Sequence, residues 1–216
     1  MQDILHLYSL PHDEKLPVVC FDELPVQLSC EVVSPLPMKE GQPKRVDYEY
    51  ERDGTCSLLV AFEPLTGLRL VETTRQRTKA DYCRFMQKVA EMFPQVEKIV
   101  LVQDNLNTHH ASSFYENLLP ADAFTLAQRF EMHYTPKKGS WLNMAELELS
   151  ALSRMCLSRR IPSREELDRE IQSLVKERNR LQVKVEWQFS IANAREKLSR
   201  HYEKVQSKDL PDKALV

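Results

Sequence analysis

The apolar run Ile99–Val102 is the feature that most constrains the fold of this chain. Its four β-branched or aliphatic residues are typical of a buried strand. Asp104 follows in a polar turn, and α/β folds present reactive groups where a central strand opens into a loop. An aspartate here also has an ordinary explanation, as a turn residue that caps the helix expected near Ser112. Asp104 alone does not decide between these two interpretations.

Composition places the chain among globular proteins of one substantial domain. It has 216 residues, of which 42% are hydrophobic and 29% charged, and this length suffices for one large core with a small appendage. No apolar run approaches the length of a membrane span, so no membrane association is expected. The five cysteines are odd in number and form no CxxC pair, which indicates neither a zinc cage nor a disulfide framework. Buried thiols in a reducing, cytoplasmic compartment are expected.

The charge is divided unevenly along the chain. Residues 1–150 carry 15 basic and 22 acidic side chains, a net charge of −7, whereas residues 151–216 carry 15 and 10, a net charge of +5. An acidic body with a basic helical end is typical of a protein that binds an anion through its C-terminal part. An ordinary solvated helix face would give the same pattern, and both interpretations stay open.

Hydrophobic periodicity and capping signals predict an alternation of strands and helices. Thr78 is a candidate N-cap and Pro94 a stop signal for one helix, and Ser163 with Glu166 forms a candidate capping box for another. Ser140 is the candidate cap of a long helix before it. The predicted strands cover residues 16–23, 55–62, 68–73, 97–103 and 132–135, and the predicted helices cover residues 79–92, 112–118, 121–130, 141–159, 164 onward and 191–204.

This order predicts an α/β fold with one mixed five-stranded sheet flanked by helices and extra C-terminal helices. The ribonuclease H-like fold matches it best, although element order alone leaves other α/β sheets possible. The predicted organisation is a polar lead over residues 1–15, a core over residues 16–160, a helical extension of the same domain over residues 161–206 and a tail over residues 207–216. A loop rich in proline and charged residues is expected over residues 34–54.

Three carboxylates are expected to meet at one edge of this sheet. Asp22 ends the first predicted strand, Asp104 ends the fourth, and Glu146 lies early in the helix after the fifth. Like charges a few ångströms apart repel strongly unless cations lie between them. Oxygen ligands suit Mg²⁺ or Mn²⁺, and two such ions can clamp the attacking and leaving oxygens of a phosphoryl displacement. Glu148 competes with Glu146 as the third ligand, but it should point about 200° further round the helix.

Ordered motifs around these carboxylates resemble a known family. The motifs are VVCFDE over residues 18–23, LVQDNLNTH over residues 101–109, HYTPKKGSWLNMAE over residues 133–146, EWQF over residues 186–189 and AREKL over residues 194–198. This series resembles the DDE transposases, and within them the bacterial insertion-sequence branch of the Tc/mariner superfamily. The resemblance covers about residues 8–204. In Leu142–Glu146 it matches the family's Leu-Asn-x-x-Glu, which favours Glu146 over Glu148.

The resemblance implies both an activity and partners. Asp22, Asp104 and Glu146 would be the catalytic, metal-binding triad, with two Mg²⁺ ions per site and Mn²⁺ able to substitute. The activity would be DNA strand cleavage followed by joining of the freed 3′-hydroxyl to target DNA, in the cytoplasm of a bacterium at the nucleoid. The partners would be double-stranded DNA, a second copy of the chain and an N-terminal DNA-binding region or chain, since no helix-turn-helix module fits before Leu16.

Six further residues are candidates for supporting roles. Asn105, His109 and Asn143 are predicted to hold the metal ligands or their waters in place, although Asn105 would serve equally as a helix cap and His109 as a structural histidine. Lys137, Lys138 and Ser140 are predicted to bind DNA phosphates in a basic turn, which would otherwise be a solvated turn. Trp141 is expected to pack under the sheet rather than to stack on DNA.

Two other functions compete with transposition at this stage. One is a ribonuclease H-like nuclease that cleaves without strand transfer. The other is an inactive transposase remnant that binds DNA or partner subunits through its basic helices. The three carboxylates favour an intact active site, whereas the missing DNA-reading module favours a remnant.

Overall fold

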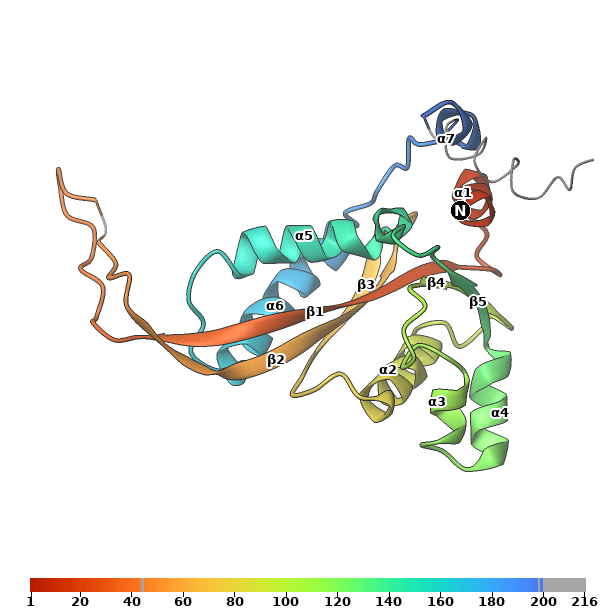
Figure 1. Cartoon of the computed structure of the whole chain (residues 1–216), viewed down its shortest axis with the longest axis horizontal. Helices are drawn as coiled ribbons and strands as arrows, with labels where there is room; N and C mark the ends of the chain where they lie inside the picture. The colour runs from red at the N-terminus through yellow and green to blue at the C-terminus, as the bar shows by residue number, and fades with distance from the viewer. Residues whose placement is uncertain (44, 198, 200–216) are drawn as a thin grey trace, which may run out of the picture.

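A computed structural model describes residues 1–43, 45–197 and 199 of the chain. Its five strands form one mixed sheet in the order β3-β2-β1-β4-β5, shown in Figure 1. β1 pairs antiparallel with β2 and parallel with β4, so it lies between them. The strands are β1 (Val18–Glu31), β2 (Tyr50–Glu63), β3 (Leu68–Thr74), β4 (Ile99–Gln103) and β5 (Phe130–Tyr134).

Alternating side chains of β1 and β2 build a core on each face of the sheet. On one face, Phe21 and Ala61 pack against α2 (Lys79–Met92), α3 (Ser112–Tyr115) and α4 (Pro120–Gln128). On the other face, Leu58, Val60 and Phe62 pack against α5 (Ala145–Cys156) and α6 (Arg164–Arg180). The result is three layers, with the sheet between two groups of helices (Figure 1). Because strand side chains alternate, Asp22 faces the α5 side.

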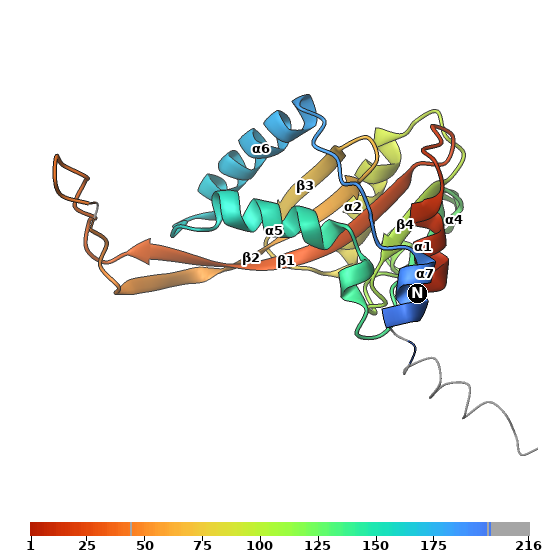
Figure 2. The same cartoon turned by 90° about the horizontal axis from the view of Figure 1, so that it is seen from above.

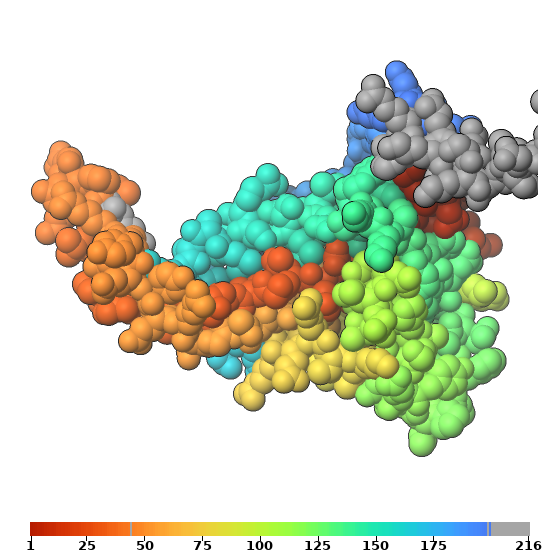
Figure 3. Space-filling view, viewed as in Figure 1, coloured from red at the N-terminus to blue at the C-terminus, as the bar shows by residue number. Residues whose placement is uncertain are grey.

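The first two strands are much longer than predicted and extend beyond the body as an arm. Their antiparallel pairing continues to Glu31 and Tyr50, with a register shift between Gln27 and Ser29. We define the arm as residues 27–55, of which residue 44 is not described, and it projects clearly in Figures 2 and 3. The predicted first strand, ending at residue 23, was therefore too short, and the predicted loop over residues 34–54 was too long, because β2 already begins at Tyr50. The residues of β2 inside the predicted loop are exposed, so no burial pattern marks them in the sequence.

Helix α2 was predicted residue for residue because its signals are local. The Thr78 side chain accepts a hydrogen bond from the backbone N–H of Asp81, and the Asp81 side chain accepts one from the N–H of Thr78. This reciprocal capping box fixes the start of the helix. In α6, Ser163 likewise accepts from the N–H of Glu166, as predicted.

The long helix predicted to start at Ser140 is divided in the structure. Ser140–Leu142 forms a 3₁₀ turn without a side-chain cap, and α5 begins only at Ala145. The side chain of Asn143, instead of Ser140, accepts a hydrogen bond from the N–H of Ala145, at 3.2 Å. The last predicted helix, over residues 191–204, is present as α7 (Ile191–Lys197), and the predicted tail over residues 207–216 lies outside the described residues.

The predicted polar lead contains a helix that sequence analysis missed. Helix α1 (Gln2–Ser9) buries Ile4 and Leu5 completely against Val102, Leu142 and other apolar residues. It lies beside α7 in Figure 2. In the part of the chain that the structure describes, no helix is long and apolar enough to cross a membrane.

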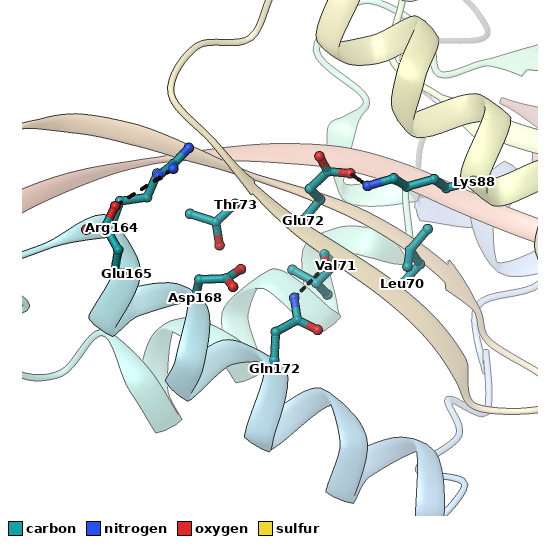
Figure 4. Close-up of a pocket in the computed structure, with 9 residues that line it drawn as sticks. All are labelled: Leu70, Val71, Glu72, Thr73, Lys88, Arg164, Glu165, Asp168 and Gln172. Atoms are coloured by element: carbon teal, nitrogen blue, oxygen red, sulfur yellow. Dashed lines mark hydrogen bonds and ion pairs between the residues drawn. The ribbon is translucent and has the colours of Figure 1, made fainter.

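The outer edge of β3 is covered by polar side chains of α6. The Gln172 side chain donates to the carbonyl of Val71 at 2.9 Å, and Asn179 both donates to and accepts from the backbone of Arg69. A hollow remains between β3 and α6, and Figure 4 shows Gln172 reaching across it, with the Glu72–Lys88 ion pair on its far side. These contacts protect an edge strand that would otherwise be open to pairing with another chain.

Candidate active site

The pairing of β1 with β4 places Asp22 opposite Asp104. The last parallel pair is Cys20 with Val102, and each aspartate lies two residues further along the chain. Asp104 directly follows the end of β4, as predicted. Asp22 does not end its strand, because β1 continues alongside β2 to Glu31. What ends beyond Cys20 is the parallel pairing, so Asp22 lies where the two strands part.

Glu146 borders the same groove as Asp22. It lies in the first turn of α5, and the groove of about 480 Å³ runs from these two carboxylates along α5 to Ser153 and Arg154. Asn143 connects the segment before α5 to β1. Its side-chain amide donates to the carbonyl of Phe21 at 2.7 Å and to the Asp22 carboxylate at 3.3 Å. Asn143 thus contacts Asp22, and its supporting role at a metal site stays a prediction.

The electrostatic environment of Asp22 includes the other two carboxylates. The pKa of Asp22 is raised to about 7, mainly by burial and in smaller part by the negative charges of Glu146 and Asp104. A hydrogen bond from the backbone of Glu23 and the charge of His109 act in the opposite direction. A cation bound beside Asp22 would offset the repulsion from Glu146 and Asp104.

His109 is buried and forms a hydrogen bond with Asp104. Its Nδ1 forms a hydrogen bond with Asp104, and its Nε2 lies 3.7 Å from a carboxylate oxygen of Glu23, without a hydrogen-bond partner among the described residues. Burial lowers the pKa of His109, but the interactions with Asp104 and Glu23 together outweigh it and raise the pKa to about 9. His109 thus holds the Asp104 carboxylate through its Nδ1 atom, and its supporting role at a metal site stays a prediction.

A buried network that sequence analysis missed fixes the loop of His109. The Gln103 side chain is fully buried; it accepts a hydrogen bond from Tyr82 at 2.9 Å and donates one to the carbonyl of His109 at 2.8 Å. Tyr134 donates to the same carbonyl at 3.2 Å. The sequence signal was a glutamine in the last position of a wholly apolar strand, where a buried amide needs partners.

Glu148 points away from the groove, as the helix geometry predicted. It is 2% exposed and accepts two hydrogen bonds from the Arg178 guanidinium, at 2.9 and 2.8 Å. The Nε atom of Arg69 lies 3.1 Å from the same carboxylate. Glu148 thus joins β3, α5 and α6 as part of a buried charge cluster, which leaves Glu146 as the carboxylate of α5 beside Asp22.

The remaining predicted residues lie at the surface. Asn105 is exposed, and within the described residues it has no recorded hydrogen bond to Asp104. Lys137, Lys138 and Ser140 are exposed in the turn before α5, where Lys138 has a φ of 64°. Trp141 is 46% exposed and meets the edge of the Phe189 ring, so the expectation that it packs under the sheet was wrong.

The donor set suits a hard divalent cation, although no cage is preformed. Among the described residues, no group of three or more His, Cys, Asp or Glu side chains is already arranged to hold a metal ion. Asp104 is turned toward His109. However, Asp22, Asp104 and Glu146 offer only carboxylate oxygens, which Mg²⁺ and Mn²⁺ prefer, and their mutual repulsion would be relieved by such an ion.

A mixed sheet between two helical layers, with carboxylates where its central parallel strands part, defines an α/β enzyme of the ribonuclease H-like class. The chain belongs to the DDE superfamily endonucleases, since the model of that family matches residues 17–168, more than half of the chain. This is a family of enzymes that cut DNA strands by phosphoryl transfer. A comparison with curated proteins finds no match.

Solved structures confirm the predicted ribonuclease H-like fold. The Mos1 mariner paired-end complex with Mn matches with a TM-score of 0.56 and 16% identity, covering 96% of this chain and 59% of that one. The Mos1 strand transfer complex matches with a TM-score of 0.56 and 15% identity, covering 96% and 58%. This chain therefore corresponds to less than two thirds of the length of those transposases.

Proposed function

We propose that this chain is the catalytic domain of a DNA transposase, which cleaves DNA strands and joins a 3′-hydroxyl to target DNA with divalent metal ions. The observation that carries the proposal is that Asp22 and Glu146 line one groove, while Asp104 directly follows the strand that pairs in parallel with β1, in a chain of the DDE endonuclease family. The likeness of its fold to Mos1 transposase supports this assignment. Assignment to a bacterial insertion sequence, with action at the nucleoid, rests on the motif resemblance alone.

In this proposal the chain's residues divide into ligands and supports. Asp22, Asp104 and Glu146 would hold two Mg²⁺ or Mn²⁺ ions, which would activate the attacking hydroxyl and stabilise the leaving oxygen. His109 holds Asp104 by its hydrogen bond, and Asn143 holds Asp22. No side-chain nucleophile is needed, because the reaction depends on positioning and charge neutralisation.

A branched DNA that mimics the joined product tests the proposal without knowledge of the element's end sequence. Incubated with the chain and Mn²⁺, such DNA should yield a rejoined target strand and a released end, by attack of its internal 3′-hydroxyl. Hydrolytic nicks without rejoined strands would favour the nuclease alternative. DNA binding with no metal-dependent product of either kind would favour an inactive remnant.

DNA is proposed to run along the groove beside α5. Arg154 is exposed at the end of the groove opposite the carboxylates, and no ion pair to it is recorded within the described residues. It lies two helical turns beyond Glu146, on the same face of α5. Lys137, Lys138 and Ser140 extend a polar, basic surface from the other end of this helix.

Replacing Arg154 with alanine is expected to weaken DNA binding evenly across sequences and to reduce the slope of log K against log salt by about 1, as for one phosphate contact. Fluorescence anisotropy at several salt concentrations measures both. Arg159→Ala is the matched control, because Arg159 is similarly exposed but is ion-paired with Glu166 and Glu170. Equal slopes for Arg154→Ala and the wild type would contradict the proposed path.

We also infer that the chain forms a homodimer and works with an N-terminal DNA-binding region or chain. The arm supports the first inference, because exposed apolar side chains gather on it instead of being scattered. These side chains are Val32, Val33, Leu36, Met38, Val46, Tyr48 and Tyr50. Light scattering should give twice the 25.2 kDa mass of one chain, and a mass of one chain at micromolar concentration would contradict dimerisation.

A further inference from the structure

The N-terminal helix reaches the part of the molecule that carries the carboxylates. α1 lies outside the segment that matches the family model, residues 17–168. Nevertheless Ile4 and Leu5 are completely buried, in a cluster with Cys20 of β1 and with Leu142 and Met144 before α5. The helix is therefore held firmly against two separate segments of the proposed active site.

A single hydroxyl of α1 contacts both of these segments. The Tyr8 hydroxyl donates a hydrogen bond to the carbonyl of Leu142 at 2.8 Å and lies 3.3 Å from the Cys20 sulfur. The Tyr8 ring is held in place by Trp187, with ring centroids 5.2 Å apart. Trp187 in turn donates to the carbonyl of Phe189 at 2.7 Å. The segment before α7 therefore packs against the Tyr8 ring.

Each contact of this hydroxyl is adjacent to a residue of the proposed site. Cys20 and Asp22 lie on the same face of β1, two residues apart. Leu142 directly precedes Asn143, whose amide donates to the Phe21 carbonyl and the Asp22 carboxylate. Asn143 also accepts from the N–H of Ala145 and so sets the start of α5, which carries Glu146 in its first turn.

We propose that Tyr8 is a positioning residue of the active site, which fixes the segment before α5 against β1 and thereby sets Glu146 relative to Asp22. Asn143 and Tyr8 join the same two segments at neighbouring points, and two such links restrict both the spacing and the tilt of α5. The inference rests on the proposed metal-dependent function of these carboxylates. It extends the functional unit to a helix that the family match does not include.

Tyr8→Phe tests this because it removes one oxygen atom and retains the ring in the core. The variant is expected to lower kcat for the branched-DNA reaction about 10-fold, since small displacements of reacting groups are costly. The KM for DNA should stay within about twofold, because the Tyr8 hydroxyl is bonded inside the protein to Leu142 and Tyr8 does not line the groove beside α5. The affinity for Mn²⁺, titrated by calorimetry without DNA, should fall several-fold.

Gln172→Met is the matched control. It likewise removes one side-chain hydrogen bond to a backbone carbonyl, that of Val71 at 2.9 Å, but in the hollow between β3 and α6. It should leave kcat and Mn²⁺ affinity unchanged, and both variants should be assayed well below their melting temperatures. A purely structural tyrosine would lower the melting temperature and change neither kinetic nor metal-binding values.

Unchanged kcat and Mn²⁺ affinity in Tyr8→Phe would overturn the inference, as would equal losses in Tyr8→Phe and Gln172→Met. Failure of the proposed function gives a different result, because the wild type itself would then form no product with Mn²⁺. Calorimetry separates the two cases. Weaker Mn²⁺ binding by Tyr8→Phe than by the wild type supports the positioning role even where no DNA product forms.

Discussion

Replacing Asp104 with asparagine is expected to reduce metal-dependent cleavage and joining of the branched DNA by about 1,000-fold or more. The change keeps the shape of the side chain but removes the negative charge that would bind the cation. Loss of a bound metal ion forfeits several kcal/mol of transition-state stabilisation, and about 4 kcal/mol corresponds to this factor. Gel analysis of single-turnover products with Mn²⁺ measures the change.

The fold and the DNA affinity of Asp104→Asn should remain close to those of the wild type. Asp104 is only partly buried, and its one strong internal contact is with His109. Asp168→Asn is the matched control, because Asp168 lines the remote hollow of Figure 4 and should retain full activity. If Asp104→Asn cleaved and joined DNA at the rate of Asp168→Asn, the assignment of Asp104 as a metal ligand would fail.

The parts of the fold that the sequence predicted well are those with local signals. α2 begins and ends as expected because Thr78 and Asp81 satisfy each other's backbone groups within one turn. β4 was predicted from the apolar run Ile99–Val102, and the strand is buried throughout in the structure. Such a strand leaves few alternatives to a central position in a sheet.

Elements defined by distant contacts were missed or misplaced. α1 has apolar residues at helical spacing, but over only about two turns, and it is fixed by packing against Val102 and Leu142. The distal half of β1 alternates the buried Val26 and Leu28 with exposed neighbours, and it extends so far because β2 pairs with it. Both patterns are present in the sequence, but each is short and sequence analysis missed it.

The same distinction applies to the candidate site. Asp22, Asp104 and Glu146 were inferred from strand order and motif spacing; in the structure Asp22 and Glu146 line one groove, and Asp104 follows the strand that pairs with β1. Whether they bind metal stays a prediction. By contrast, the hydrogen bonds of Gln103 and Tyr8 join residues far apart in the chain. Sequence spacing could not reveal those partners.

Replacement by glutamine should lower stability but not activity at Glu148, and activity but not stability at Glu146. Glu148→Gln is expected to lower the free energy of unfolding by about 3–5 kcal/mol, because it leaves buried arginine charges without their partner. Arg69 is completely buried and Arg178 is 15% exposed, so water can compensate little. Urea unfolding followed by circular dichroism measures this loss.

Glu146→Gln is expected to change the free energy of unfolding by no more than about 0.5 kcal/mol, as for other partly exposed side chains. It should nevertheless abolish Mn²⁺-dependent cleavage and joining, because Glu146 borders the groove together with Asp22. Folded Glu148→Gln, assayed well below its melting temperature, should keep its cleavage activity. The reverse result, with Glu146→Gln active and folded Glu148→Gln inactive, would make Glu148 the third ligand. That outcome would require α5 to rotate by about half a turn and to withdraw Glu148 from Arg69 and Arg178, at the energetic cost that the unfolding experiment measures.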